Sequence, residues 1–274
     1  MLLNHEPQQF ELGKRLSFAY QAKGPPTSLI VFVHGFTGDA VATWEGFREH
    51  LLTSNDFVQS DIVFYGYDSL YKQVVTSANC FRQFMDAVSQ SSEGSTKQLE
   101  RVRDAFVGRR HSRVIFVCHS LGAVIVRRAV LDCVDAVNTG RRRCGWEGAN
   151  WMLLFGPAHA GGRPIGLANS ALAQGQFLPA LASFAQYLIP VLEGLRPDGQ
   201  TIRRLFVDTE RLQHTGLVNA KVIVFGENDK VVYREPPYQN DPLALDIFGE
   251  DHVSICKPRA NFQDPLEILA GALP

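Results

Sequence analysis

The sequence has little net charge and few cysteines, and both features exclude classes of protein. It contains 27 lysines and arginines against 28 aspartates and glutamates, which gives a formal net charge of -1. A balanced chain has no overall field that would hold it on nucleic acid or anionic lipid, so we expect no nucleic-acid partner. The five cysteines show no C-x-x-C spacing, and their odd number disfavours a closed disulfide framework. We therefore expect reduced thiols.

A long apolar segment is also missing from the first residues. The stretch MLLNHEPQQFELGKRL reaches Glu6 and Pro7 before any apolar core of the kind that a signal peptide carries, which predicts a cytoplasmic protein. What the chain does have is size, because 274 residues, 45% of them hydrophobic, can form a substantial buried core. No repeat or Pro/Ser-rich linker divides the sequence, so we expect one domain over residues 1–274.

Segments typical of strands and of helices alternate along the chain. Short apolar runs rich in β-branched residues indicate strands that are buried on both faces. They occupy residues 28–33, 60–67, 113–117, 150–156 and 220–225. The segments between them carry apolar residues at helical spacing. This order predicts an α/β fold with a doubly wound, mostly parallel sheet, whose functional loops lie at the carboxyl ends of the strands.

One predicted strand runs directly into a serine. In VIFVCHSLGAVIV, residues 114–126, a tight turn separates the strand from the helix that follows, and Ser120 stands at its apex. This placement lifts the hydroxyl clear of the sheet and turns the amide of Leu121 toward the same space. Gly122 lets the helix and the strand pack closely. A serine hydroxyl is a poor nucleophile alone, so the turn matters only if a base and an acid lie within reach.

The stretch CHSLGA after a strand resembles the nucleophile elbow of the α/β-hydrolase superfamily, written G-x-S-x-G, with Cys118 in place of the first glycine. The alternative is an ordinary strand-turn-helix connection with a capping serine. A second segment, VFVHGF, resembles the oxyanion loop of the same superfamily. The resemblance implies that the backbone amides of Phe36 and Leu121 form an oxyanion hole, and that His34 shapes the loop without moving protons.

The resemblance also implies positions for the acid and the base. In VIVFGENDKVV a buried strand is followed by Asp229 at the place of the triad carboxylate, with Glu227 as an alternative and a solvated turn as the structural reading. In FGEDHVSICKP, His252 lies in a loop between the last strand region and a final helix near residues 264–273. Ser120, Asp229 and His252 then follow the chain order expected of this fold.

Seven other histidines compete with His252. His159, in FGPAHAGG, also follows a strand and could reach the site as an alternative base or as part of a pocket wall. His119 adjoins the serine, but the strand geometry turns it away, which favours a packed structural role. We expect the remaining ones, apart from His34, to be surface or capping residues: His5, His50, His111 and His214. No pair has metal-ligand spacing, so we expect neither a metal nor another cofactor.

Residues 164–192 contain no charged side chain and follow the strand that ends near Phe155. α/β-Hydrolases insert lids at this place, so we expect residues 160–195 to form a helical lid or cap over an apolar acyl pocket, with ordinary core packing as the alternative. Two prolines inside the stretch disfavour a membrane-spanning helix. The motifs HGFTGDAVATW, CHSLGA, LLFGPAHAGG and HVSICKP together resemble the lipase-like branch that includes serine-active-site-containing proteins and GPI inositol deacylases.

The sequence therefore predicts a serine hydrolase that cleaves carboxylic esters of hydrophobic or lipid-like substrates, with possible transient contact with a membrane surface. Two alternatives stay open. One is a hydrolase fold kept as a binding or signalling domain with little turnover. The other is a thioesterase or acyltransferase that uses the same triad. The oligomeric state, the acyl length and the alcohol do not follow from the sequence.

Overall fold

The computed structural model describes residues 6–70, 72–91, 96–141, 144–146, 148, 150–163, 194–234 and 238–274. In this part of the chain, eight strands form one sheet in the order β1-β2-β4-β3-β5-β6-β7-β8. The strands are β1 (Gln8–Leu12), β2 (Arg15–Tyr20), β3 (Ser28–Val33), β4 (Ser60–Tyr65), β5 (Arg113–His119), β6 (Asn150–Phe155), β7 (Ala220–Gly226) and β8 (Leu245–Ile247). The described α-helices are α1 (Phe47–Thr53), α2 (Val74–Val88), α3 (Lys97–Ala105), α4 (Leu121–Asn138), α7 (Gln200–Leu212) and α8 (Asp264–Ala270).

The sheet is parallel from β4 to β8 and antiparallel at its other end. β3 pairs in parallel with both β4 and β5, and β5, β6, β7 and β8 continue the parallel order. β1 and β2 pair antiparallel with each other, and β2 pairs antiparallel with β4. Parallel pairing turns the carboxyl ends of β3 to β8 to the same edge, where the functional loops of such sheets lie.

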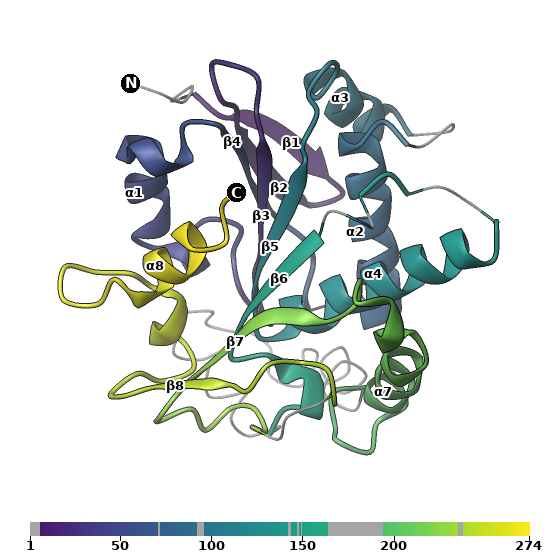
Figure 1. Cartoon of the computed structure of the whole chain (residues 1–274), viewed down its shortest axis with the longest axis vertical. Coiled ribbons are helices and arrows are strands. Elements are labelled where there is room, and N and C mark those ends of the chain that lie inside the picture. The colour runs from purple at the N-terminus through teal and green to yellow at the C-terminus, as the bar shows by residue number, and fades with distance from the viewer. Residues whose placement is uncertain are drawn as a thin grey trace.

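Helices cover both faces of the sheet. Figure 1 shows the sheet with α1 and α8 on one side and α2, α4 and α7 on the other. The buried apolar residues divide in the same way, because one cluster joins the sheet to α2, α3, α4 and α7 and a second joins it to α1 and α8. The alternation of side chains along each strand supplies both clusters at once.

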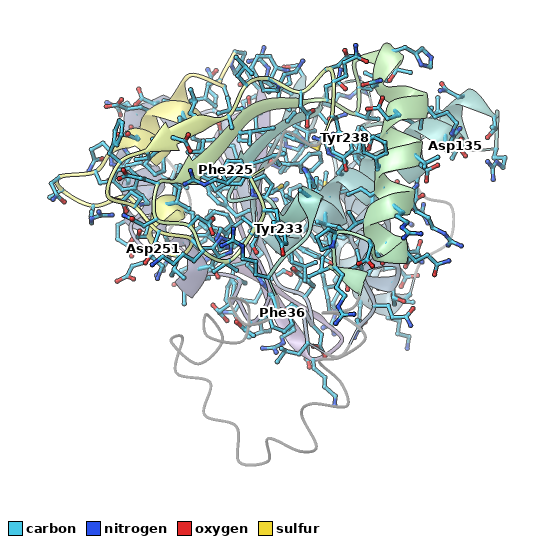
Figure 2. All side chains as sticks on the ribbon, turned by 90° about the horizontal axis from the view of Figure 1, so that it is seen from below. Phe36, Asp135, Phe225, Tyr233, Tyr238 and Asp251 are labelled. Carbon is cyan, nitrogen blue, oxygen red and sulfur yellow. A yellow bond between two sulfur atoms is a disulfide. The ribbon has the colours of Figure 1, made fainter. Side chains whose placement is uncertain are left out.

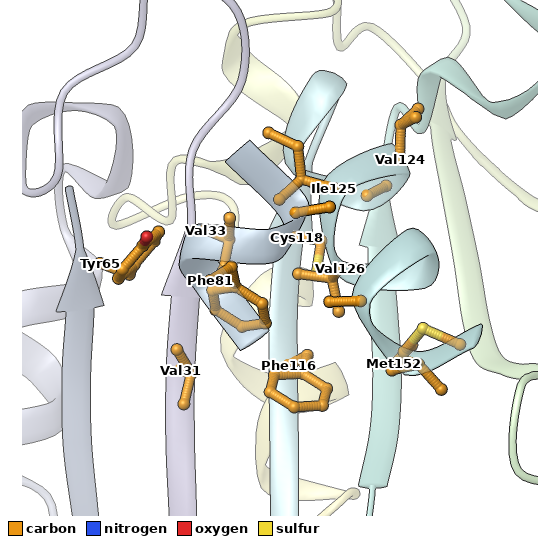
Figure 3. Packing of buried hydrophobic residues seen from close by; sticks show 14 of the residues in the cluster. Val31, Val33, Tyr65, Phe81, Phe116, Cys118, Val124, Ile125, Val126 and Met152 are labelled. Atoms are coloured by element: carbon orange, nitrogen blue, oxygen red, sulfur yellow. The ribbon is translucent and has the colours of Figure 1, made fainter. Parts of the chain in front are cut away.

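The close-up of the first cluster shows why the central strands read as continuous apolar runs. Val31 and Val33 of β3 lie beside Phe116 and Cys118 of β5, and Phe81 of α2 packs over them (Figure 3). All six residues of β3 and all six of β4 are buried. A strand covered on both faces has no position at which a solvated side chain would be stable.

The predicted fold is confirmed, with three strands missed and one segment outside the description. Each of the five predicted strands is present, with ends within two residues of the expected ones. The strands β1, β2 and β8 were not predicted from the sequence. The predicted lid at 160–195 falls almost wholly outside the described residues, because 164–193 are not described. None of the helices in the described ranges is long and apolar enough to cross a membrane.

The expectation that all five cysteines are reduced is wrong for two of them. Cys133 of α4 and Cys144 form a disulfide, with their Cα atoms 6.0 Å apart. The chain turns back after α4 and brings the two side chains together in the core, where both are fully buried. That separation lies within the range that a disulfide spans. An odd cysteine count therefore concealed one local pair, 11 residues apart in sequence.

Candidate active site

The strand-turn-helix at Ser120 has an unusual backbone. β5 extends two residues beyond its predicted end, to His119, and α4 begins at Leu121. Between them Ser120 adopts φ 53° and ψ -119°. A positive φ is uncommon for a residue other than glycine and marks a sharp reversal that tertiary contacts hold in place. Here the main chain of Ser120 is tied to the neighbouring strand, since its N–H donates to the Phe155 carbonyl at 3.1 Å.

Two glycines let the chain approach this turn closely. A Cβ at Gly122 would lie 2.2 Å from the Val33 carbonyl oxygen. A Cβ at Gly35 would lie 2.7 Å from the Ser120 Cβ. Both contacts are shorter than real Cβ atoms tolerate, so helix α4 and the loop after β3 pack against the turn only because these positions lack side chains. The sequence motif contains Gly122, whereas the contact of Gly35 with Ser120 follows only from the tertiary structure.

The structure brings together the three residues that chain order had singled out. Ser120 Oγ lies 3.0 Å from His252 Nε2, and His252 Nδ1 lies 2.8 Å from Asp229 Oδ2. With a neutral imidazole, the hydroxyl donates to Nε2 and the Nδ1–H donates to the carboxylate. All three side chains are buried, although they come from positions as far as 132 residues apart. Two consecutive hydrogen bonds thus connect a hydroxyl, an imidazole and a carboxylate.

The carboxylate of Asp229 is held in its ionised form. Burial opposes ionisation, but the hydrogen bond from His252 and those from the amides of Val231 and Val232 outweigh it, so the pKa of Asp229 is lowered. The backbone N–H groups of Val231 and Val232 donate to Oδ1 at 2.8 and 3.2 Å, and Oδ2 remains free to face the imidazole. The alternative acid, Glu227, is exposed and accepts from the Gly249 amide at 3.0 Å. The geometry therefore favours Asp229 over Glu227 as the partner of His252.

The loop that carries His252 rests against the end of β7. A Cβ at Gly226 would lie 2.5 Å from the Glu250 carbonyl oxygen, which also accepts from the Asn228 amide at 2.9 Å. Asp251, which precedes His252, accepts at Oδ1 from the amides of Val253 and Ser254 at 2.9 and 2.8 Å and so closes a turn around His252. The segments that bear the acid and the imidazole are thus fixed to each other by backbone contacts.

The loop after β3 is braced by a histidine and a tyrosine. His34 Nδ1–H donates to the Gly35 carbonyl at 2.9 Å, and the Tyr67 amide donates to Nε2 at 3.4 Å. The Tyr67 ring stacks on the imidazole, with 4.3 Å between centroids, and its hydroxyl donates to the His34 carbonyl at 2.8 Å. Burial lowers the pKa of His34 to about 4, so the ring is neutral at physiological pH. These contacts fit the expected role of His34 in shaping the loop.

The two residues whose amides are predicted to form the oxyanion hole, Leu121 and Phe36, adjoin the contact between Ser120 and Gly35. Leu121 is the first residue of α4, and N–H groups in the first turn of a helix have no acceptor within the helix. Phe36 follows Gly35, which packs against Ser120. Figure 2 views the molecule from below and labels Phe36 and Asp251, the neighbour of His252.

The competing histidines occupy other places. His119 is buried and donates its Nε2–H to the main-chain oxygen of His252 at 2.7 Å. His159 is buried too. Its ring lies 5.7 Å from that of Tyr238, which Figure 2 shows beside α7. Burial and the nearby Arg127 hold the pKa of His159 well below its usual value. The triad geometry uses His252 alone.

The structure also shows the surroundings of two further residues named from the sequence, Cys118 and His111. Cys118, at the first glycine of the elbow motif, is fully buried, and burial raises the pKa of its thiol well above the usual value. The thiol is therefore no rival nucleophile. The expectation that His111 is a surface or capping residue is wrong, because its Nε2 lies 2.8 Å from Asp61 Oδ2 and its side chain is only 6% exposed. Arg109 donates to the same buried carboxylate, so His111 belongs to an internal polar cluster.

Sequence comparison gives one family match. Residues 24–158 match the model of a family described as "Putative serine esterase (DUF676)". This region runs from just before β3 to the segment after β6 and includes Ser120 but neither Asp229 nor His252. No curated protein sequence matches the chain significantly.

Solved structures resemble the chain over nearly its whole length at low identity. Lipase BlEst2 of Bacillus licheniformis in its mature form is 15% identical with a TM-score of 0.54, covering 92% of this chain and 96% of the lipase. The peroxisomal α/β-hydrolase Lpx1 of Saccharomyces cerevisiae is 11% identical with a TM-score of 0.54, covering 98% of this chain and 88% of its own. The 2-hydroxy-6-oxo-6-phenylhexa-2,4-dienoate hydrolase of Rhodococcus sp. strain RHA1 is 12% identical with a TM-score of 0.51, covering 99% and 100%. The chain therefore has the fold of these α/β-hydrolases.

Proposed function

We propose that this protein is a serine hydrolase that cleaves carboxylic esters of hydrophobic or lipid-like substrates. The observation that carries the proposal is the hydrogen-bonded series from Ser120 Oγ through the His252 imidazole to Asp229 Oδ2. A hydroxyl at a strained strand-helix turn, an imidazole in contact with it and a carboxylate behind the imidazole are the groups that acyl transfer requires. The match of residues 24–158 to a serine esterase family supports the same reaction.

The proposed reaction has two halves. Ser120 Oγ attacks the carbonyl carbon of the ester while its proton passes to His252 Nε2, and Asp229 stabilises the resulting imidazolium. The tetrahedral intermediate collapses, His252 returns the proton to the departing alkoxide, and an alcohol leaves. Water then attacks the acyl-enzyme and gives a proton to His252. The second collapse releases the acid and restores the Ser120 hydroxyl, so no metal or other cofactor enters any step.

The negative oxygen that forms in each half needs donors. We propose that the amides of Phe36 and Leu121 supply them, because helix α4 starts at Leu121 and Gly35 brings the preceding loop against Ser120. Preorganised donors of this kind contribute roughly 3 to 4 kcal/mol each to the lowering of the barrier. Because both donors would be backbone groups, the fold of the turn, and not a side chain, would set their position.

Labelling with a fluorophosphonate probe tests the proposal directly. We expect the folded protein to react at Ser120 and to hydrolyse p-nitrophenyl esters, and we expect Ser120→Ala to abolish labelling and to lower kcat at least about 1000-fold. Asp229→Asn should lower kcat strongly while Glu227→Gln, the matched control, should leave it nearly unchanged. A folded protein that neither labels nor hydrolyses would favour the binding or signalling alternative.

Substrate preference separates the remaining readings. Esters of short and long acyl chains at equal alcohol test the preference for hydrophobic substrates, and acyl-CoA of the same chain lengths tests the thioesterase alternative. We expect kcat/KM to rise with acyl length for esters and to remain below the ester value for the thioester. Equal kcat/KM values along the ester series would contradict the proposed apolar acyl pocket. Faster turnover of acyl-CoA would favour a thioesterase.

A further inference from the structure

His119 contacts the main chain of the residue that we propose as the general base. It is the last residue of β5, and its Nε2–H donates to the His252 carbonyl at 2.7 Å. The two imidazole rings lie 4.7 Å apart at an angle of 44°. The Trp44 ring lies nearly perpendicular to that of His119, at 83° and with 6.4 Å between centroids. The side chain therefore fills the space between the sheet and the loop that carries His252.

The second ring nitrogen of His119 faces the loop after β3. A Cβ at Gly35 would lie 3.1 Å from Nδ1, and the same Cβ would lie 2.7 Å from that of Ser120. One imidazole thus lies against both segments that acyl transfer would use, the loop preceding the Phe36 amide and the loop of His252. A bond from Nε2 to a carbonyl also fixes the tautomer, because the proton must reside on Nε2.

The charge of His119 agrees with this placement. Burial, and to a smaller extent the positive charge that His252 can acquire, lower its pKa to about 3. Asp229 raises it and His34 lowers it by smaller amounts. A neutral ring next to His252 is what the proposed mechanism needs, because a second imidazolium would oppose the charge that His252 acquires when it accepts the Ser120 proton.

We infer that His119 is a positioning residue, which holds the main chain at His252 so that Nε2 of His252 stays within hydrogen-bond reach of Ser120 Oγ. The inference rests on the proposed function. Its physical basis is the sensitivity of the reaction to geometry, because a displacement of about 1 Å between reacting groups costs on the order of 100-fold in rate. His119 acts on the backbone of His252, whereas Asp229 acts on its ring. The two contacts together fix the main chain of His252 and the orientation of its ring.

A pair of variants separates the hydrogen bond from the packing. His119→Gln keeps an N–H donor at a similar reach, and His119→Met keeps a similar volume without a donor. We expect His119→Met to lower kcat about 10- to 100-fold with KM within about twofold, because substrate binding does not involve this bond. We expect His119→Gln to stay within about threefold of the wild-type kcat. Equal losses in the two variants, or a change confined to KM, would overturn the inference.

Two measurements by nuclear magnetic resonance need no turnover, so they separate a failure of this inference from a failure of the proposed function. In the wild-type protein, nitrogen shifts should show His119 as the neutral Nε2–H tautomer at pH 7, and an Nδ1–H tautomer would contradict the inference whether or not any variant folds. The downfield proton of His252 Nδ1–H, bonded to Asp229, should persist in His119→Gln and broaden in His119→Met. A wild-type protein that shows both signals but no esterase activity would refute the proposed reaction and leave the positioning intact.

Discussion

Gly156 lies directly against the imidazole of His252. A Cβ at position 156 would be 3.0 Å from His252 Nδ1 and 3.2 Å from Asp229 Oδ2, so it would intrude on the hydrogen bond between them. Gly156 follows the last residue of β6 and adopts φ 50°, while its amide donates to the Val224 carbonyl at 2.7 Å. The strand next to the elbow thus leaves room for the acid and the base by ending in a glycine.

Gly156→Ala should therefore impair activity more than stability. The methyl group would displace the His252 ring or the Asp229 carboxylate by several tenths of an ångström, and we expect kcat for p-nitrophenyl esters to fall about 10- to 100-fold. The left-handed backbone adds roughly 1 to 2 kcal/mol of destabilisation. Steady-state kinetics and urea unfolding measure the two effects.

Gly216→Ala is the matched control for Gly156→Ala. Gly216 adopts φ 70°, but no atom of the described residues lies within 4 Å of the Cβ that alanine would add. It should lose a similar free energy of unfolding and keep the wild-type kcat. If both variants lost the same activity, backbone strain would explain the result and the contact with His252 would not.

A buried ion pair between Arg127 of α4 and Asp241 predicts a large loss of stability when one partner is removed. Arg127 and Asp241 are 0% and 1% exposed, and Nη2 lies 2.6 Å from Oδ2. Arg127→Met would leave the Asp241 carboxylate buried without its counter-charge, so we expect a loss of about 3 to 5 kcal/mol in the free energy of urea unfolding. In Arg127→Met the Asp241 carboxylate has already lost its counter-charge. Adding Asp241→Asn to this variant should therefore lower the free energy of unfolding by less than Asp241→Asn does in the wild-type protein.

A surface pair provides the comparison for that measurement. Arg141 lies 2.8 Å from Asp135, with 68% of the Arg141 side chain exposed. Water screens such a pair, so Arg141→Met should change the free energy of unfolding by less than about 0.5 kcal/mol. Equal losses in Arg127→Met and Arg141→Met would mean that burial of the Arg127 pair has no energetic consequence.

Three buried histidines predict that the protein loses stability in mildly acidic solution. The pKa of His34 is lowered to about 4, that of His119 to about 3 and that of His159 well below its usual value, all chiefly by burial. Between these values and about 6.5, the unfolded chain binds protons that the folded chain does not, so the free energy of unfolding falls as the pH falls. Each histidine contributes a slope of up to about 1.4 kcal/mol per pH unit.

Urea unfolding at several pH values between 7 and 4.5 measures this slope. His34→Gln should remove about a third of it, since glutamine does not titrate. The lowered pKa of Asp229 acts in a separate window, because its stabilisation is lost only below the usual carboxyl pKa of about 3.8. A slope that did not change in His34→Gln would contradict the assignment of the acid sensitivity to that ring.

The sequence predicts those parts of the fold in which burial dictates composition. β3 and β4 are covered on both faces, so apart from the paired Asp61 at the start of β4 their residues are mostly apolar, and the runs identify the strands and the edge where functional loops gather. β1 and β2 are different, because β1 lies at the border of the sheet and only Phe10 in it is buried. Its polar residues are as compatible with a loop as with a strand, and pairing with β2 decides between them.

The same distinction applies to the candidate site. Ser120, Asp229 and His252 are found from motifs and from chain order, because each must follow a particular strand. The bond from His119 to His252 and the room that Gly156 leaves for His252 and Asp229 are contacts between segments far apart in the sequence, and the fold alone brings them together. Pattern and order identify the candidate groups, whereas the packing that aligns them follows only from the tertiary structure.

The disulfide between Cys133 and Cys144 contradicts the expectation of five reduced thiols, and thiol titration tests it. With Cys133 and Cys144 paired, thiol titration of the unfolded protein should detect three thiols, those of Cys80, Cys118 and Cys256, and five after reduction. Because the bond closes a loop of only 11 residues in sequence, its loss through Cys144→Ala should lower the free energy of unfolding by about 2 to 3 kcal/mol. Cys256→Ala, at a buried free thiol, gives the cost of the packing change alone. Activity should survive reduction, since the bond joins the body of α4 to the segment before β6 and touches none of the triad residues. Five thiols in protein that was never exposed to a reductant would refute the pairing.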